Sequence, residues 1–226
     1  MKFFSKLSAV GAVLVLGTAL AAADTVTFGS YGTLLGQDGV AVAPVAGQNT
    51  AVLSGGNATY NIGSDGGSVW SPAGPNSSWV SFNGQTGPTS NFVAPNGTYT
   101  YTTTFTVTGG SYYGSISAMA DDTTDVLLDG NLLIPAGTIG TDTHCADGAP
   151  NCIQPATYNF VAYALSGGVH TLTFNLQQTG LVYEGLDFYG SISTNSPVPE
   201  PGTLFLLGTG LVGSAGTLMR RMRASK

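Results

Sequence analysis

Four aspartates lie close together in the second half of the chain, and they are the best candidates for cation ligands. They are Asp121, Asp122, Asp125 and Asp129, within the segment ADDTTDVLLDGN. Carboxylates gathered on a turn can chelate Ca²⁺, with Asn131 or main-chain oxygens completing the shell. The run does not have the spacing of a known calcium loop, so a solvated turn is the alternative interpretation.

The chain has two cysteines, Cys145 and Cys152, in a loop that also contains Gly and Pro. In an exported chain, such an even pair is most simply a disulfide. The alternative is a metal site that adds His144 and Asp147 to the two thiolates. That spacing matches no familiar zinc pattern, and oxidation would remove both thiolate ligands. We therefore expect the disulfide.

Two tryptophans are candidates for a glycan contact. Trp70 and Trp79 flank the segment SPAGPNSS, whose Pro and Gly residues disfavour regular structure. An indole on such a loop could stack on a sugar ring. The other interpretation is that both rings fill the end of a core, because large aromatic side chains dominate core burial.

Residues suited to catalysis are scarce. The chain has two histidines, His144 beside a cysteine and His170 on an apolar strand face, where a hydrogen-bonded structural imidazole is the ordinary outcome. Glu184 and Asp187 could form a hydrolase pair, but their spacing on a strand places them on opposite faces. The sequence therefore argues against an enzyme.

The charges are divided sharply along the chain. All six Lys and Arg residues lie near the two ends, whereas all twelve carboxylates lie between Asp24 and Glu200. Such a purely acidic body would repel nucleic acid and anionic lipid. Divalent cations and neutral sugars are the ligand classes that this charge distribution still allows.

The composition indicates which elements must position these residues. Of the 226 residues, 42% are hydrophobic and 10% aromatic, enough to form a core, but only 8% are charged. Abundant Thr and 33 Gly suit short strands and tight turns better than helices. The composition therefore predicts an all-β domain.

Alternating hydrophobicity locates the strands. Residues 98–108 place Tyr and Phe on one face and Thr on the other, and residues 169–176 place Leu and Phe on the same face as His170. Asp129-Gly130 between two apolar runs predicts a type I′ hairpin. Further strands are expected at 25–30, 50–53, 79–82, 113–120, 124–128, 158–164 and 181–192. This spacing predicts an antiparallel, jelly-roll-like β-sandwich.

The first 23 residues have the features of a secretory signal peptide. Lys2 and Lys6 provide a positive n-region, residues 7–20 an apolar h-region, and residues 21–23 a small-residue cleavage site before Asp24. A retained membrane anchor is the alternative. Because the apolar stretch is short for a span, we expect a helix that signal peptidase removes.

The C-terminal segment contains three ordered elements. Val198, Pro199, Glu200 and Pro201 precede an apolar run, which is followed by a cluster of Arg220, Arg221 and Arg223. The run, about 18 residues at ~1.5 Å each, just reaches across a bilayer core as a transmembrane helix. The Arg cluster would stay on the cytoplasmic side.

These elements resemble a PEP-CTERM sorting signal, the tail that bacterial exosortases recognise. The resemblance covers about the last 30 residues. It implies cleavage near the Pro-Glu-Pro motif in a Gram-negative bacterium whose genes often include exopolysaccharide production. A plain C-terminal anchor is the alternative, although such an anchor needs no Pro-Glu-Pro at its entrance.

A second resemblance lies in the body of the chain. Residues 120–130, 165–174 and 185–190 are similar to passages of galactose-binding-like jelly-roll domains. This resemblance implies a fold and carries over no binding residue, so it does not decide function.

Together, these features predict four segments: a signal peptide (1–23), a β-sandwich (24–193), a linker (194–197) and the sorting signal (198–226). The function expected is a structural or adhesive protein of the cell surface or biofilm matrix, with weak binding to exopolysaccharide. The alternatives are a calcium-dependent carbohydrate-binding module and, less in keeping with the residues, a secreted glycan hydrolase.

Overall fold

The computed structural model describes residues 23–36, 49–50, 52–53, 55–63, 69–89, 93–141 and 145–194. Within these residues the chain forms strands and no helix. The all-β prediction is therefore confirmed for this part of the protein. Residues 24–194 form one compact unit.

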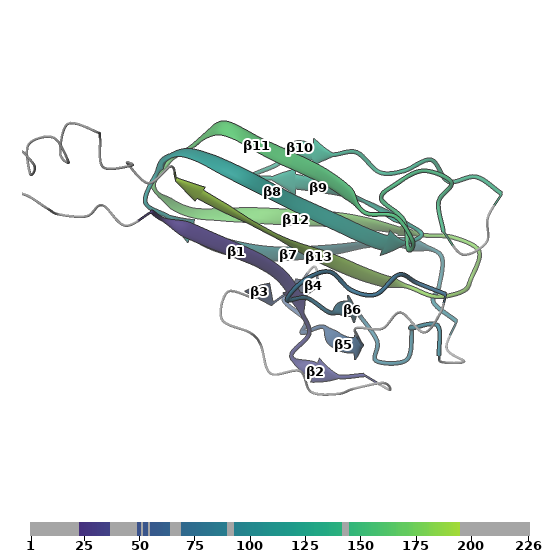
Figure 1. The fold of residues 1–226 in the computed structure, drawn as a ribbon. Helices are drawn as coiled ribbons and strands as arrows, with labels where there is room; N and C mark the ends of the chain where they lie inside the picture. Colours follow the sequence, from purple (N-terminus) through teal and green to yellow (C-terminus); the bar gives the residue numbers. More distant parts are fainter. Residues whose placement is uncertain are drawn as a thin grey trace, which may run out of the picture. The chain divides into compact units, whose positions relative to one another are not determined.

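The described residues form thirteen strands in two sheets (Figure 1). Their bounds are β1 Thr25–Tyr31, β2 Leu34–Leu35, β3 Asn49–Thr50, β4 Val52–Leu53, β5 Tyr60–Gly63, β6 Trp79–Ser81, β7 Gly97–Val107, β8 Gly110–Asp121, β9 Thr123–Leu128, β10 Asn131–Ile134, β11 Ala156–Leu165, β12 Gly168–Gln178 and β13 Gly185–Thr194.

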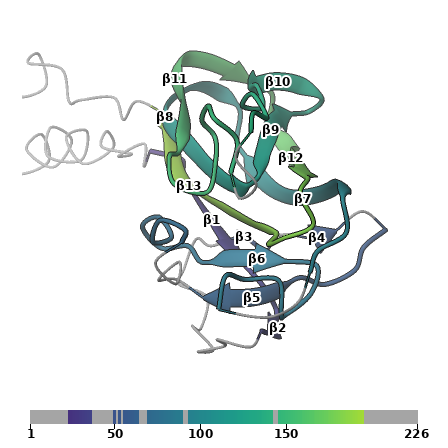
Figure 2. The ribbon, with the colours of Figure 1, turned by 90° about the vertical axis from the view of Figure 1, so that its right-hand side faces the viewer.

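The larger, eight-stranded sheet has the order β11-β8-β13-β6-β5-β2, with β1 beside β13 and β3 beside β1. The five-stranded sheet has the order β10-β9-β12-β7-β4. The long pairings are antiparallel, as expected, whereas the short pairs β1–β3 and β2–β5 are parallel. Figure 2 shows β8, β11 and β13 in one layer and β9, β10 and β12 in the other.

The core lies between the inner faces of the two sheets. Phe174 of β12 stacks on Phe188 of β13 with ring centroids 4.5 Å apart, and Phe28 of β1 meets the edge of Phe105 of β7 at 5.2 Å. The alternating residues of β7 and β12 that the sequence assigns to one face are buried here, except Tyr99, which is half-buried and packs against the core. Burial of these side chains provides the main driving force for the fold.

A second, smaller cluster lies outside this core. Met119 of β8 alternates with the core residues Ala118 and Ala120, and so points to the opposite face of its sheet. Around it pack Trp70, Trp79 and other buried side chains, namely Ile62, Cys145 and Cys152. This second cluster is the region on which the site residues converge.

The hairpin predicted at Asp129-Gly130 is present between β9 and β10. Asp129 has a φ of 50° and Gly130 a φ of 80°, the positive values that a type I′ turn requires at both positions. The short strands β2 and β5 were not predicted, because four residues or fewer give too little alternation to detect.

Candidate functional site: a buried acidic pair beneath the disulfide loop

Asp121 and Asp122 lie where the chain passes from one sheet to the other. Asp121 ends β8 in the eight-stranded sheet, and β9 of the five-stranded sheet begins at Thr123. Both aspartates are only 1% exposed. The position of an acidic pair at this crossing, rather than on a solvated turn, is the central feature of the site.

Each carboxylate has one satisfied oxygen. Asp121 Oδ2 accepts a hydrogen bond from Trp70 Nε1 at 2.6 Å. Asp122 Oδ2 accepts two, from the main-chain N of Thr179 at 2.6 Å and from its hydroxyl at 2.5 Å. Among the residues described, neither Asp121 Oδ1 nor Asp122 Oδ1 has a hydrogen-bond partner.

Burial raises the pKa of the Asp121 carboxyl group well above its usual range, because desolvation disfavours the charged form. The hydrogen bond from Trp70 opposes this shift, whereas the negative charges of Asp122 and Glu184 add to it. The sequence provides no Lys or Arg between Lys6 and Arg220 that could balance these charges.

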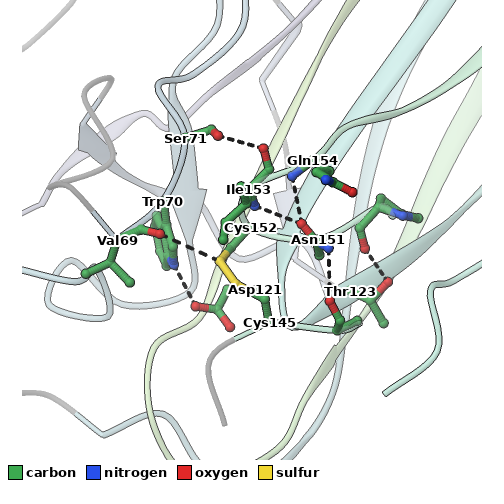
Figure 3. The surroundings of a disulfide bond; sticks show 12 residues. Val69, Trp70, Ser71, Asp121, Thr123, Cys145, Asn151, Cys152, Ile153 and Gln154 are labelled. Carbon is green, nitrogen blue, oxygen red and sulfur yellow. Dashed lines mark hydrogen bonds between the residues drawn. A yellow bond between two sulfur atoms is a disulfide. The ribbon is translucent and has the colours of Figure 1, made fainter. Parts of the chain in front are cut away.

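The loop closed by the Cys145–Cys152 disulfide lies against the acidic pair (Figure 3). The main-chain N of Ala146 donates to the carbonyl of Asp122 at 3.2 Å, and the Thr123 hydroxyl donates to the carbonyl of Pro150 at 2.5 Å. The disulfide expected from the sequence is therefore present, and its loop is fastened to the β8–β9 crossing.

The same loop is fastened to the tryptophan segment. The main-chain N of Ser71 donates to the carbonyl of Cys152 at 2.8 Å, and the Ser71 hydroxyl donates to the carbonyl of Ile153 at 2.6 Å. Figure 3 shows Trp70 pointing its indole N–H at Asp121 beside the disulfide. The Cys145–Cys152 loop and the segment with Trp70 and Ser71 are far apart in sequence, and together they cover the Asp121–Asp122 pair.

Trp70 and Trp79 are buried, with 4% and 1% exposure, and pack on each other with ring centroids 4.4 Å apart. Trp79 Nε1 donates to the carbonyl of Ser71 at 3.0 Å. Stacking on a sugar needs an open ring face, and neither indole offers one in this arrangement. The sequence analysis gave core filling as the second interpretation of the two tryptophans, and both are indeed buried. They cover the outer face of a sheet, however, and not the end of the sandwich.

The four aspartates of the acidic run do not meet at one point. Asp125 Oδ1 accepts from both the main-chain and side-chain nitrogens of Asn175, at 3.2 and 2.9 Å. Asp129 Oδ1 accepts from the main-chain N of Thr171 at 2.9 Å. In the described part of the chain, no group of three or more His, Cys, Asp or Glu residues could hold a metal ion.

His170 has the structural role expected from the sequence. Its Nδ1 lies 2.6 Å from Asp129 Oδ2 and its Nε2 lies 2.9 Å from the carbonyl of Ser166. Although burial opposes the shift, these hydrogen bonds raise the pKa of His170, and the imidazole lowers the pKa of Asp129. Both ring nitrogens are thus occupied.

Glu184 and Asp187 are both fully buried and have separate partners. Glu184 Oε1 accepts from the Tyr101 hydroxyl at 2.5 Å and Oε2 accepts from the Ser81 hydroxyl. Asp187 accepts from the Ser30 hydroxyl and from the main-chain N of Gly74, each at 2.9 Å. They do not form a catalytic pair.

Gln178 and Thr179 are the site residues that the sequence analysis missed. Thr179 holds Asp122, as described above, and the Gln178 side chain, only 1% exposed, donates from Nε2 to the Thr179 carbonyl at 3.0 Å. The available signal was the alternation of β12, which continues through Leu176 to Gln178 and so predicts a buried amide.

Several predicted residues lie outside the described ranges. These are the signal peptide up to residue 22, His144, and the whole tail with the sorting motif and the Arg cluster, Val198, Pro199, Glu200, Pro201, Arg220, Arg221 and Arg223. In the ranges that are described, no helix is long and apolar enough to cross a membrane.

Comparison with known families identifies the tail. The PEP-CTERM protein-sorting motif matches residues 197–223, so the chain carries the signal that its final segment resembles. This motif implies an exported, membrane-anchored precursor that an exosortase processes. No curated protein matches the chain.

Solved structures similar to the chain include carbohydrate-binding modules. One is the GH26-CBM35 β-(1,4)-mannanase of Podospora anserina, with 14% identity, a TM-score of 0.36, and coverage of 66% of this chain but 27% of the mannanase. Another is a family 35 carbohydrate-binding module of Clostridium thermocellum, with 13% identity, a TM-score of 0.30, and coverage of 62% and 86%. A CBM36 module in complex with calcium and xylotriose has 9% identity, a TM-score of 0.24, and coverage of 45% and 76%.

Proposed function

We propose that the mature protein is a non-catalytic β-sandwich that an exosortase releases from its membrane anchor in a Gram-negative bacterium, for a structural or adhesive role at the cell surface or in the extracellular matrix. The observation that carries this proposal is the sorting motif at residues 197–223, directly after β13 ends at Thr194.

The ends of the domain support removal of both terminal signals. The main-chain N of Asp24 donates to Thr194 Oγ1 at 3.0 Å, and the main-chain N of Thr194 donates to the Asp24 carbonyl at 2.9 Å. The Asp24 carboxylate also accepts from Tyr112 OH at 2.6 Å. Cleavage before Asp24 and after Thr194 would therefore leave every strand of the sandwich in place.

The buried site residues support a role without catalysis. Glu184 and Asp187 are closed off from solvent, and both nitrogens of His170 are engaged in hydrogen bonds. A general base must reach its substrate, directly or through one water. A domain whose titratable groups are buried or engaged in internal hydrogen bonds is suited to a structural role.

The test is to express the chain in its host with and without the exosortase gene, and to measure the protein in membrane and surface fractions. We expect the wild-type chain to leave the membrane fraction only when the exosortase is present. The Glu200→Ala variant should stay in the membrane fraction, whereas Asp147→Asn, an exposed carboxylate of the sandwich, should behave as wild type. Equal release without the exosortase would contradict the proposal.

The partner that we propose for the mature domain is an exopolysaccharide. A domain that carries carboxylates and no Lys or Arg favours a neutral polysaccharide over an anionic one. Affinity gel electrophoresis in neutral and anionic polysaccharides tests this, and retardation only in neutral gels is expected. Because both tryptophans are buried, their fluorescence should change little on binding. If the protein migrates in every polysaccharide gel as it does in a gel without polysaccharide, the proposed binding to glycan is wrong.

A further inference from the structure

The first and last residues of the sandwich lie side by side at one of its ends. β13 ends at Thr194, whose main-chain N donates to the carbonyl of Asp24, and the main-chain N of Asp24 donates to Thr194 Oγ1. The Asp24 carboxylate accepts from the main-chain N of Thr108 in the β7–β8 turn at 2.8 Å. A Cβ added to Gly109 of this turn would lie 2.7 Å from the main-chain N of Gly167 in the β11–β12 turn. We call this surface the exit face; its residues are 24, 108–111, 166–168 and 194.

The other end of the sandwich is far from the exit face. β8 runs from Gly110 at the exit face to Asp121, and its 12 residues at about 3.3 Å each put these two residues about 36 Å apart. The Cys145–Cys152 loop lies against that far end, because the main-chain N of Ala146 donates to the carbonyl of Asp122. A partner that reaches only a short way from Thr194 therefore meets the exit face and not the disulfide loop.

The sorting motif follows the exit face after a short tether. Residues 195–198 alone separate Thr194 from Pro199, the first proline of Pro-Glu-Pro. A fully extended chain advances at most ~3.6 Å per residue, so Pro199 stays within about 18 Å of Thr194, half the length of β8. An enzyme that holds the Pro-Glu-Pro motif must therefore lie beside the exit face.

The side chains of the exit face are small. Besides Thr108, its exposed turn residues are Gly110, Ser111, Ser166, Gly167 and Gly168. Asp24 is the one acidic residue of the set, and its carboxylate accepts hydrogen bonds from Tyr112 OH at 2.6 Å and from both the main-chain N and the hydroxyl of Thr108. These hydrogen bonds lower the pKa of Asp24 and keep its side chain against the β7–β8 turn. The face thus permits the close approach that the short tether requires.

We propose that the exit face lies against the exosortase while the tail is cut, so that the size of the side chains on this face determines how fast the protein is released. This inference rests on the proposed function, because the exosortase must be the processing enzyme. Its physical basis is that the tether is shorter than the sandwich, so that only the exit face can be turned toward an enzyme bound at Pro199. The far end, with the disulfide loop, points away from the enzyme.

The test measures the rate at which the full chain leaves the membrane fraction of its host, by pulse labelling in the presence of the exosortase. The Ser111→Trp/Ser166→Trp variant places two bulky side chains at exposed positions of the exit face. We expect its release to be about tenfold slower than that of wild type, or ~1.4 kcal/mol in the barrier. The matched control, Ile153→Trp/Gln154→Trp, adds the same bulk at exposed positions of the disulfide end and should be released at the wild-type rate. A wild-type rate for the exit-face variant would overturn the inference and leave the proposed function intact.

Changes in tether length distinguish steric exclusion from misfolding. About ten Gly and Ser residues inserted between Asn195 and Ser196, outside the matched motif at 197–223, lengthen the tether by about 17 Å. This insertion should restore wild-type release to the exit-face variant, whereas deletion of Asn195 and Ser196 should slow release of the otherwise unchanged chain. If the insertion leaves the variant slow, its defect does not come from proximity to the enzyme, and the inference is wrong. Failure of the wild-type chain itself to be released would contradict the proposed function, and with it this inference.

Discussion

At the scale of single residues, the molecule stands out for carboxylates buried without cationic partners. Glu184 is the best defined. It is fully buried and accepts hydrogen bonds from the hydroxyls of Tyr101 and Ser81, and Ser81 in turn accepts from Thr86 at 2.5 Å. Burial raises the pKa of Glu184 from 4.5 to about 7, although these hydrogen bonds oppose the shift.

This shift predicts how stability depends on pH. Below pH 4.5 Glu184 is protonated in both the folded and the unfolded state, so the shift has no effect on stability. Between pH 4.5 and 7 the unfolded state ionises first, and the free energy of unfolding falls, by about 3 kcal/mol at most. Denaturant unfolding in EDTA at pH 5 and pH 8 should therefore show a less stable protein at pH 8.

The Glu184→Gln variant should reduce this difference, whereas Asp147→Asn should leave it as in wild type. The His170–Asp129 pair acts in the same direction, because the pKa of His170 is raised and its contribution is lost as pH rises through that value. A wild-type domain as stable at pH 8 as at pH 5 would contradict the buried, uncompensated state of Glu184.

Sequence reasoning identified some of these residues and missed others for physical reasons. The roles of His170 and of the two cysteines followed from neighbours close in sequence or on the same strand. The burial of Asp121 and Asp122 did not, because their partners Trp70 and Thr179 lie 51 and 57 residues away. Such long-range contacts leave no periodic signal in the sequence.

At the scale of elements, the hairpin between β9 and β10 depends on the positive φ angles of its two turn residues, Asp129 and Gly130. Gly130 has a φ of 80° and a Cβ added there would meet nothing within 4 Å, so the cost of a side chain is conformational rather than steric. Gly130→Ala should lower the free energy of unfolding by about 1 kcal/mol.

The control for this prediction is Gly97→Ala. Gly97, at the start of β7, also has open space around it, but it does not have a positive φ. Urea unfolding should find this variant close to wild type. Equal effects of the two substitutions would show that the turn geometry does not determine the cost.

The disulfide loop is the second element with a measurable role. Its cysteines are 7 residues apart in sequence, and closing so short a loop contributes about 2–3 kcal/mol to stability in the chain-entropy description. The Cys145→Ser/Cys152→Ser double variant should lose this amount. It should also show a change in Trp fluorescence, because the loop is bonded to Ser71 beside Trp70. An unchanged emission spectrum would contradict the packing of the loop on the tryptophan segment.

Long strands were predicted more successfully than short ones. β7 and β12 have enough alternating residues to define their buried faces, and the Asp-Gly turn determines the hairpin. β2 and β5 depend on pairing partners that only the folded chain brings together. The long loop between β10 and β11, which carries the disulfide, gave no sign in the sequence that it would cover the acidic pair.

At the scale of the whole molecule, charge and sorting are linked. Every Lys and Arg lies outside residues 7–219, so removal of both terminal signals leaves a domain with carboxylates and no Lys or Arg. The sorting motif at 197–223 follows this domain and includes the Arg cluster. The mature form should therefore resist trypsin even when unfolded, while chymotrypsin should still digest it.

The intact mass of the protein recovered from the cell surface shows directly whether both terminal signals have been removed. We predict a chain that begins at Asp24 and ends before the Arg cluster, with a mass that trypsin leaves unchanged. A surface form that still contains Arg220 would contradict exosortase processing.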